Sequence, residues 1–179
     1  MTIEPDTKDW TWVLKQRCPE CGFDGSAVDR RDVAGLVRAN ASSWPAVLAR
    51  PDVARRARPD RWSDLEYACH VRDVFRLYAE RLELMLVVDD AHFVNWDQDA
   101  TAIEERYDRQ DPAVVARELM DAGAVLADRF ATVTGGQWQR TGVRSDGAAF
   151  TVDTFARYLA HDPIHHLWDV GAAAPLPAG

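Results

Sequence analysis

One segment of the chain constrains its fold more than any other: RWSDLEYACHVRDVFRLYAERLELMLVVDD, residues 61–90. Its apolar residues recur at spacings of three and four, which is the period of one face of an α-helix. Ser63 and Glu66 form the S-x-x-E pattern of a capping box, with Trp62 and Tyr67 placed as a hydrophobic staple. The segment therefore predicts a helix of about six or seven turns that buries one side in a core.

Three further segments carry helix signals of the same kind. One begins at Asp29, a residue suited to N-capping, and contains Pro45 in its last turn. Asp111 followed by Pro112 marks a second helix start, and Thr151 is placed to cap a third. Four substantial helical segments with little strand signal predict an all-α fold, a four-helix bundle.

The 179 residues fit a single domain. Residues 1–28, rich in tryptophan and turn residues, are expected to form an irregular arm packed on the domain. Residues 29–172 are expected to form the bundle, and residues 173–179 a flexible tail. Between the helices, one short helix is expected over residues 100–107, and a hairpin or extended crossing over residues 134–147.

Charge and hydropathy exclude two classes of partner. The net charge is −8 and the arginines are interspersed with carboxylates, whereas nucleic-acid binding needs a concentrated basic surface. No run approaches the ~18 apolar residues of a membrane span, and no N-terminal apolar stretch resembles a signal peptide. The sequence therefore predicts a cytoplasmic protein with neither nucleic acid nor membrane as a partner.

The cysteines are Cys18, Cys21 and Cys69. The CPEC motif has the spacing of half a zinc site or of a redox pair, but a structural zinc needs four ligands and there is no second CxxC. A thioredoxin-type motif normally opens a helix after a strand, whereas this one precedes the turn-forming GFDG. Three interpretations stay open for Cys18 and Cys21: a structural loop, a disulfide or redox-sensitive pair, and a contribution to a metal site.

Three of the five histidines lie in the stretch HDPIHH near the C-terminus. On a helix, His161 and His165 lie one turn apart and point the same way, so their imidazoles can bind one divalent ion. His166 lies about 100° further round the helix axis and is expected outside that ligand set. His70 is the third ligand expected, because it lies beside the apolar stripe of the longest helix, and facing helices of a bundle build metal sites in this way.

The sequence singles out five further residues near this set. His92, in a connecting segment, is the weaker candidate for a third ligand. Asp73, Asp162, Asp169 and Tyr158 are placed to orient the imidazoles, with a surface role as the alternative for each aspartate. No catalytic or cofactor-binding residue is assigned beyond the metal ligands.

Pro163 lies between the two paired histidines. It lacks the N–H that would bond the carbonyl of Leu159, and its ring clashes with that carbonyl, at a cost of ~3 kcal/mol in a helix interior. The helix is therefore expected to kink between Tyr158 and Pro163, or to restart with Asp162 as its cap.

The pattern WSxLEYxxHVRD at residues 62–73, followed by HDPIHH, resembles the DinB-like superfamily of four-helix bundles. This superfamily includes bacillithiol- and mycothiol-dependent transferases and the mycothiol-dependent maleylpyruvate isomerase. The resemblance implies an up-down-down-up topology, frequent dimers, and a divalent metal, zinc or nickel first, held by His70, His161 and His165. Many members continue the second motif with Arg-Gly-Gln, whereas this chain continues with His166, Leu167, Trp168 and Asp169.

The resemblance also implies a class of reaction. A metal with one exchangeable position stabilises a thiolate, which is the nucleophilic form of a thiol. The expected function is a metal-dependent S-transferase that joins a mycothiol-type thiol to a small-molecule electrophile, with a homodimer as the expected assembly. The alternatives are a metal-dependent hydrolase, a non-catalytic metal- or small-molecule-binding protein of stress response, and a dimeric scaffold whose histidines only pack and cap.

Overall fold

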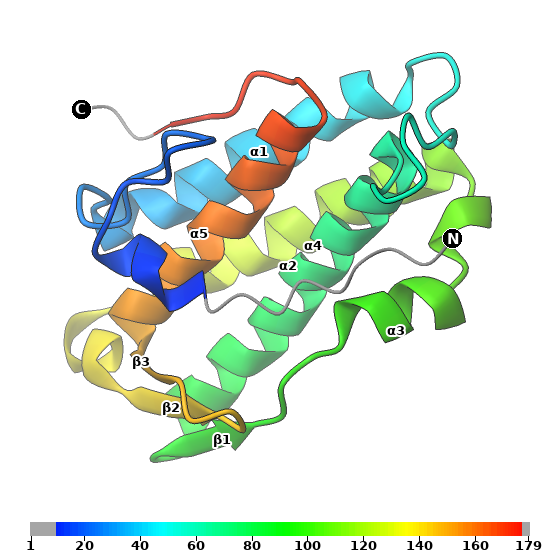
Figure 1. Cartoon of the computed structure of the whole chain (residues 1–179). Helices are drawn as coiled ribbons and strands as arrows, with labels where there is room; N and C mark the ends of the chain where they lie inside the picture. Colours follow the sequence, from blue (N-terminus) through cyan, green and yellow to red (C-terminus); the bar gives the residue numbers. More distant parts are fainter. Residues whose placement is uncertain (1–9, 177–179) are drawn as a thin grey trace.

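The computed structural model describes residues 10–176 of the chain (Figure 1). Its long helices are α1 (Val33–Leu48), α2 (Asp64–Val87), α4 (Pro112–Thr132) and α5 (Val152–Asp169). In Figure 1, α1 and α5 run in one direction along the bundle, and α2 and α4 run in the other. The predicted four-helix bundle and its up-down-down-up topology are confirmed.

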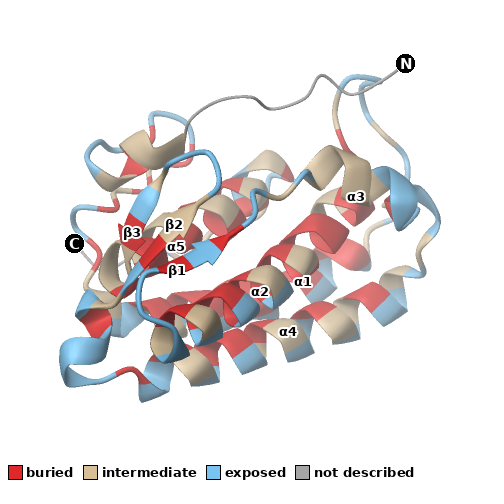
Figure 2. Cartoon of the chain, turned by 90° about the horizontal axis from the view of Figure 1, so that it is seen from below, coloured by how far each residue is buried: buried red, intermediate tan, exposed pale blue. Residues whose placement is uncertain are grey.

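The helices pack around one shared core. Helices α1 and α2 each contact both α4 and α5. His70 on α2 can therefore lie close to residues of α5. Figure 2 shows the buried sides of α1, α2 and α4 turned toward one another, with exposed residues on their outer sides. The apolar stripes seen in the sequence therefore make the core. Its largest fully buried side chains include Trp44, Phe75, Leu82, Leu119, Leu126, Phe155 and Leu159.

Hydrogen bonds at the helix starts follow the sequence signals. Ser63 Oγ accepts from the Glu66 N–H at 3.3 Å, and the Glu66 carboxylate accepts from the Ser63 N–H at 2.8 Å, which completes the capping box. Asp111 accepts from two backbone N–H groups in the first turn of α4. Asp29 caps a short 3-10 turn (Arg30–Asp32) that leads into α1, rather than α1 itself.

Pro163 does not interrupt α5, which continues as one helix from Val152 to Asp169. The predicted restart at this proline is therefore wrong, whereas a kink between Tyr158 and Pro163 stays a prediction. The side chains on both sides of Pro163 are locked in the core, with Leu159 and Ile164 almost completely buried. The Asn40 side chain also donates to the Pro163 carbonyl at 2.7 Å. We infer that this packing offsets the backbone hydrogen bond that proline cannot make.

The long connections form a small sheet at one end of the bundle. Strand β1 (Ala91–Phe93) pairs in parallel with β2 (Thr141–Arg144), and β2 pairs antiparallel with β3 (Ala149–Thr151) to form a hairpin. β1 was not predicted, because three residues are too few to show the period of a strand. The predicted short helix is found slightly earlier, as α3 (Gln98–Glu104), and is followed by a 3-10 turn, η3 (Tyr107–Arg109).

The arm that precedes α1 lies against α5 (Figure 1). It contains the 3-10 turn η1 (Trp10–Leu14). Residues 1–9 of the predicted arm and residues 177–179 of the predicted tail lie outside the described residues. Within the described part, the arm is integrated in the packing of the domain. Its buried side chains are Val13, Cys18, Cys21, Phe23 and Val28.

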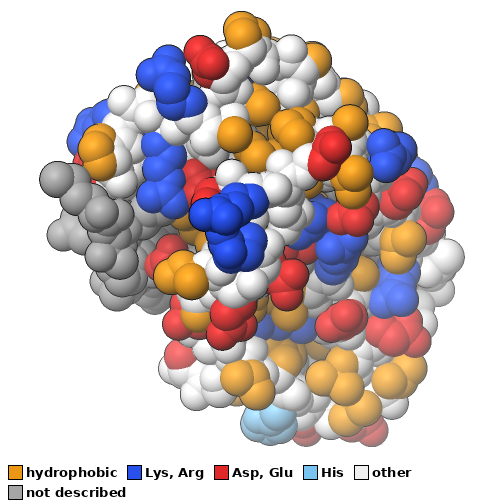
Figure 3. Space-filling view, turned by 90° about the vertical axis from the view of Figure 1, so that its right-hand side faces the viewer, with side chains coloured by type: hydrophobic (Ala, Val, Ile, Leu, Met, Phe, Trp, Pro, Cys, Tyr) orange, Lys and Arg blue, Asp and Glu red, His pale blue; other side chains and the backbone are white. Residues whose placement is uncertain are grey.

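The surface carries mixed charge. On the face shown in Figure 3, acidic, basic and apolar side chains are intermixed. None of the helices in residues 10–176 is both long and apolar enough to cross a membrane.

Candidate metal centre

Helix α5 presents two interleaved pairs of metal-binding side chains. His161 and His165 are four residues apart, and so are Asp162 and His166. Residues four apart share a helix face, while the two pairs are about 100° apart around the axis. The structure turns these pairs toward different neighbours: Asp162 and His166 toward His70 on α2, and His161 and His165 toward the N-terminal arm.

His70, Asp162 and His166 form the first group, which we call the His/Asp triad. Asp162 Oδ1 lies 3.4 Å from His70 Nε2 and 3.6 Å from His166 Nε2. Ligand bonds of about 2.0–2.2 Å to one ion place neighbouring donor atoms about 3–3.5 Å apart. The two separations from Asp162 Oδ1 are therefore close to those that a divalent ion requires, and the donor atoms of all three residues lie within 4.8 Å of one another.

The triad contains buried polar atoms that form no hydrogen bond among the described residues. His70 is only 1% exposed. Neither of its ring nitrogens, nor Asp162 Oδ1, has a partner in hydrogen-bond geometry among the described residues. Buried polar atoms without a partner are rare, because each one loses its bonds to water. A divalent cation would satisfy His70 Nε2 and Asp162 Oδ1 together, so these residues fit the metal that the sequence pattern implies.

The surroundings of Asp162 favour the ionised form of its carboxyl group, which is the form that binds metal ions. Burial opposes the charged form, but the neighbouring His166 and His70 outweigh burial and hold the pKa of Asp162 below its ordinary value. The carboxylate is therefore charged at neutral pH. It supplies the negative donor of a two-histidine, one-carboxylate set, which suits Zn²⁺, Fe²⁺ and related ions.

Aromatic rings and a carboxylate fix the imidazoles of the triad. The His70 ring stacks on Trp96, with centroids 5.3 Å apart, and the Trp62 ring lies at 5.2 Å. His166 Nδ1 lies 2.9 Å from Asp169 Oδ2, so His166 Nε2 is the nitrogen that faces Asp162. Such a histidine-to-carboxylate hydrogen bond is the usual way in which proteins orient a metal ligand.

A cavity of about 820 Å³ adjoins the triad. Small-molecule sites have volumes of about 300–1,000 Å³, so this cavity is large enough for a substrate. Asp162 and His166 line it, so an ion at the triad would be reached from this cavity. The aromatic and polar side chains in its wall include Trp10, Trp96, Asn95, Tyr158, Arg81 and Arg144.

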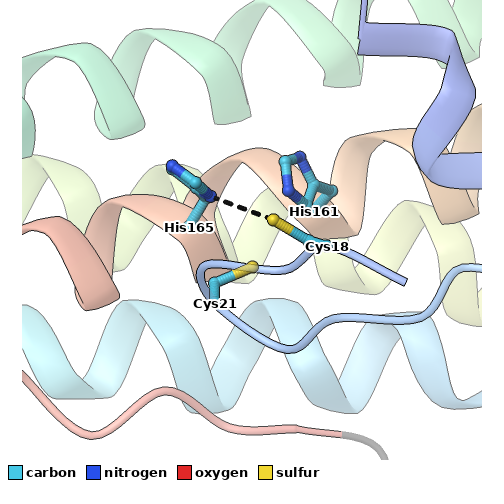
Figure 4. Close-up of side chains that lie close together, drawn as sticks. All are labelled: Cys18, Cys21, His161 and His165. Carbon is cyan, nitrogen blue, oxygen red and sulfur yellow. Dashed lines mark hydrogen bonds between the residues drawn. The ribbon is translucent and has the colours of Figure 1, made fainter. Parts of the chain in front are cut away.

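The second group, which we call the Cys/His cluster, consists of Cys18, Cys21, His161 and His165 (Figure 4). All four side chains are buried. Burial raises the pKa of the Cys21 thiol to about 12. Burial, reinforced by the nearby His165, lowers the pKa of His161 to about 4, so this imidazole is neutral at pH 7.

The structure thus divides the three histidines expected to share one ion. His70 lies in the triad, whereas His161 and His165 lie in the Cys/His cluster. His166, expected outside the ligand set, and Asp162, expected only to orient imidazoles, take the places beside His70. The cause is the rotation of α5 about its own axis, which the spacing of residues along the helix leaves open.

Two other residues that the sequence singled out lie apart from both groups. His92 is exposed on β1. Asp73 accepts from the Arg72 guanidinium at 2.9 Å and from the Tyr107 hydroxyl at 2.5 Å, within an ion-pair network on α2. The structure therefore places neither residue in the triad or in the Cys/His cluster.

Tyr158 lies beside the cavity, and Asp169 lies beside the triad. Tyr158 lines the cavity, where Arg144 donates to its hydroxyl at 3.3 Å. Asp169 Oδ2 lies 2.9 Å from His166 Nδ1, which is the contact expected of a carboxylate that orients an imidazole.

Two signals for these groups were present in the sequence. Asp162 and His166 have the same four-residue spacing as the HxxxH pair, and the CPEC motif supplies two further donors for the other pair. The pairing of the arm with α5 left no signal in the sequence, because the residues that meet, Cys18 and His165, are 147 positions apart.

Fold and site together define a class of protein: a four-helix bundle with side chains between two of its helices that could hold a metal ion. The family model of the DinB superfamily matches residues 27–170, and the chain belongs to this superfamily. Among solved structures, the chain is similar to YfiT from Bacillus subtilis, described as a probable metal-dependent hydrolase with an unusual four-helix bundle topology. The two share 15% sequence identity with a TM-score of 0.70, over 80% of this chain and 89% of that one. Among curated proteins, no sequence matches the chain significantly.

Proposed function

We propose that this protein is a metal-dependent enzyme that holds its divalent ion at the His/Asp triad and binds its substrate in the adjoining cavity. The observation that carries the proposal is that His70 Nε2 and His166 Nε2 both lie close to Asp162 Oδ1, at 3.4 and 3.6 Å. His70 Nε2 and Asp162 Oδ1 are buried without a hydrogen-bond partner among the described residues. Three protein ligands leave a position for water or substrate, which is the arrangement of catalytic metal sites.

Bound at the triad, a divalent ion would lower the pKa of a thiol or of a water molecule and so make either one nucleophilic at neutral pH. The residues of the chain hold and orient the participants. Asp169 keeps His166 Nε2 directed at the triad, and Trp96 and Trp62 hold the His70 ring. Zinc or nickel, which the family resemblance implies, suits this donor set, as does Fe²⁺.

The surroundings of Arg81 support a proposal for the chemical class of the substrate. It lines the cavity and is 6% exposed, yet it forms no ion pair with a carboxylate among the described residues. Its guanidinium donates to the Val94 carbonyl at 2.7 Å and lies 4.8 Å from the Phe93 ring centroid. A buried guanidinium favours an anionic partner. We therefore propose a substrate with a carboxylate or phosphate group.

Transfer of a mycothiol-type thiol to an electrophile is the first activity that we propose. The superfamily includes such transferases, and the cavity volume of about 820 Å³ leaves room for a thiol beside a second small molecule. Hydrolysis is the second candidate, favoured by the description of the structurally similar YfiT. We also propose that the protein forms a homodimer, because the resemblance to the DinB-like superfamily implies this assembly.

Metal content tests the site. Purified wild-type protein should carry a divalent ion at the triad, and both His70→Ala and His166→Ala should lose one equivalent per chain when metals are measured by mass spectrometry. His92→Ala is the matched control, because this exposed histidine lies outside both groups. Unchanged metal content in both triad variants would contradict the proposed site.

Activity assays separate the two reactions. The metal-loaded protein is incubated with mycothiol and an anionic electrophile, and in parallel with an anionic ester. Conjugation by the wild type that is lost in His70→Ala supports thiol transfer. If the wild type instead hydrolyses the ester without conjugation, and His70→Ala does not, the result supports the hydrolase. If the metal-loaded protein catalyses neither conjugation nor ester hydrolysis, the proposed enzymatic function is overturned.

A further inference from the structure

We propose that Cys18, Cys21, His161 and His165 bind a second ion, zinc, in a closed tetrahedral site that fixes the N-terminal arm on α5. Each residue offers one donor atom, and the four donor atoms all lie within 4.8 Å of one another. Figure 4 shows both cysteines of the arm beside the two histidines of α5. This site is separate from the His/Asp triad and shares none of its residues.

The separations between the donor atoms are close to those in a zinc site, and a bound ion would draw the four atoms slightly closer together. Zinc bonds of about 2.3 Å to sulfur and 2.0 Å to nitrogen place tetrahedral ligands about 3.3–3.8 Å apart. Cys18 Sγ and His165 Nδ1 are already 3.7 Å apart. His161 Nε2 is buried and has no hydrogen-bond partner among the described residues. An ion bound by His161 Nε2 would give that nitrogen the partner it lacks.

The outer contacts of His165 support the same arrangement. Its Nε2 lies 3.3 Å from Glu20 Oε2, so the opposite nitrogen, Nδ1, is the one that faces Cys18. Metal-binding histidines usually donate their second N–H to a carboxylate in this way. Glu20 belongs to the CPEC motif itself, so the motif supplies two ligands and the group that orients a third.

The backbone of the arm is shaped to bring both sulfurs to one side. Gly22 has φ +77°, a left-handed conformation that glycine adopts without strain. The turn is closed by Gly22 N–H donating to the Cys18 carbonyl at 3.0 Å and by Cys18 N–H donating to the Phe23 carbonyl at 2.7 Å. Two cysteines and two histidines in a tetrahedral set favour zinc, and a shell of four protein ligands is structural rather than catalytic.

The site would connect the arm to the cavity. Trp10, in the same arm, has its ring centroid 5.3 Å from that of His161, and both Trp10 and Thr11 line the cavity. Zinc that holds the arm on α5 therefore also holds part of the cavity wall. Helix α5 would carry a structural site on one face and the His/Asp triad on the next.

Zinc stoichiometry of matched variants tests the proposal. The double variant Cys18→Ser, Cys21→Ser and the single variant His161→Ala should each lose one zinc per chain, whereas Cys69→Ala, which removes the third buried thiol, should lose none. His70→Ala should retain this zinc, so loss at the triad and loss at the Cys/His cluster are distinguishable. Equal zinc content in the wild type and the double variant would overturn the proposal.

A measurement on the wild-type protein avoids variants that fail to fold. Zinc added to the reduced, metal-free chain should protect Cys18 and Cys21 from alkylation by iodoacetamide, and a chelator should restore their reaction. Cobalt(II) in place of zinc should give a sulfur-to-metal charge-transfer absorption that persists in His70→Ala. Three outcomes would each contradict the site. Zinc fails to protect the cysteines, cobalt gives no such absorption, or a Cys18–Cys21 disulfide forms in preference to the zinc complex.

Discussion

The Nδ1 atom of His166 lies 2.9 Å from Oδ2 of Asp169, three residues further along α5. Arg61 pairs with the same carboxylate and holds it in place. This contact directs the other ring nitrogen of His166 toward Asp162, at 3.6 Å. Asp169 therefore orients a proposed metal ligand without belonging to the triad.

Asp169→Asn should weaken binding of a divalent ion at the triad by about 10–100-fold, the usual effect of losing a carboxylate behind a histidine ligand. Competition with a chromophoric chelator measures the dissociation constant. Asp128→Asn is the control, because this exposed aspartate pairs with Arg38 away from the site. The same affinity in Asp169→Asn and the wild type would show that the contact does not support metal binding.

Arg81→Met should raise KM for an anionic substrate by about 10-fold or more, since a hydrogen bond to a charged group contributes about 1.5–3 kcal/mol. KM for a neutral analogue should change little. Arg144→Met is the matched comparison, because Arg144 lines the same cavity but already pairs with Asp146 at 2.8 Å. An equal change for the anionic and neutral compounds would argue against charge recognition by Arg81.

Glu66→Gln should lower stability most at neutral pH. Burial opposes ionisation of Glu66, but its hydrogen bonds with Arg56 and Ser63 outweigh burial and lower its pKa in the folded protein. A lowered folded-state pKa stabilises the fold above the ordinary pKa of the group, and this stabilisation is lost as the pH falls through the folded-state value. The difference in unfolding free energy between wild type and variant should therefore shrink in acid.

Urea unfolding of both proteins between neutral and acidic pH measures this difference. Glu83→Gln, an exposed position on the same helix, is the control and should alter stability little at any pH. A Glu66→Gln difference that stays constant with pH would contradict an electrostatic role.

Gly123→Ala and Gly35→Ala should change stability in opposite directions. A Cβ at Gly123 would lie 2.7 Å from the Ala41 Cβ, and overpacking of this kind costs about 1–3 kcal/mol. That cost equals or exceeds the gain of about 1 kcal/mol in helix propensity. A Cβ at Gly35 meets no heavy atom within 4 Å, so the same exchange should stabilise α1. Thermal unfolding measures both, and stabilisation by Gly123→Ala would show that α1 and α4 can move apart.

Most of the fold could be predicted from local sequence signals. Ser63 with Glu66 and Asp111 with Pro112 mark helix starts through hydrogen bonds made within one turn, and the apolar period of each helix records its buried side. The restart predicted at Pro163 failed because the energy of that proline depends on core packing and on Asn40, which is 123 residues away.

The sequence by itself determined that HDPIHH carries metal-binding side chains at helical spacing, and that His70 lies on a facing helix. Only the tertiary structure decided which side chains meet. Burial of Leu159, Ile164 and Leu167 fixes the rotation of α5, and this rotation turns Asp162 and His166 toward His70 while His161 and His165 meet Cys18 and Cys21. Helical spacing sets the angles within one helix, but packing against neighbouring elements sets the direction in which each face points.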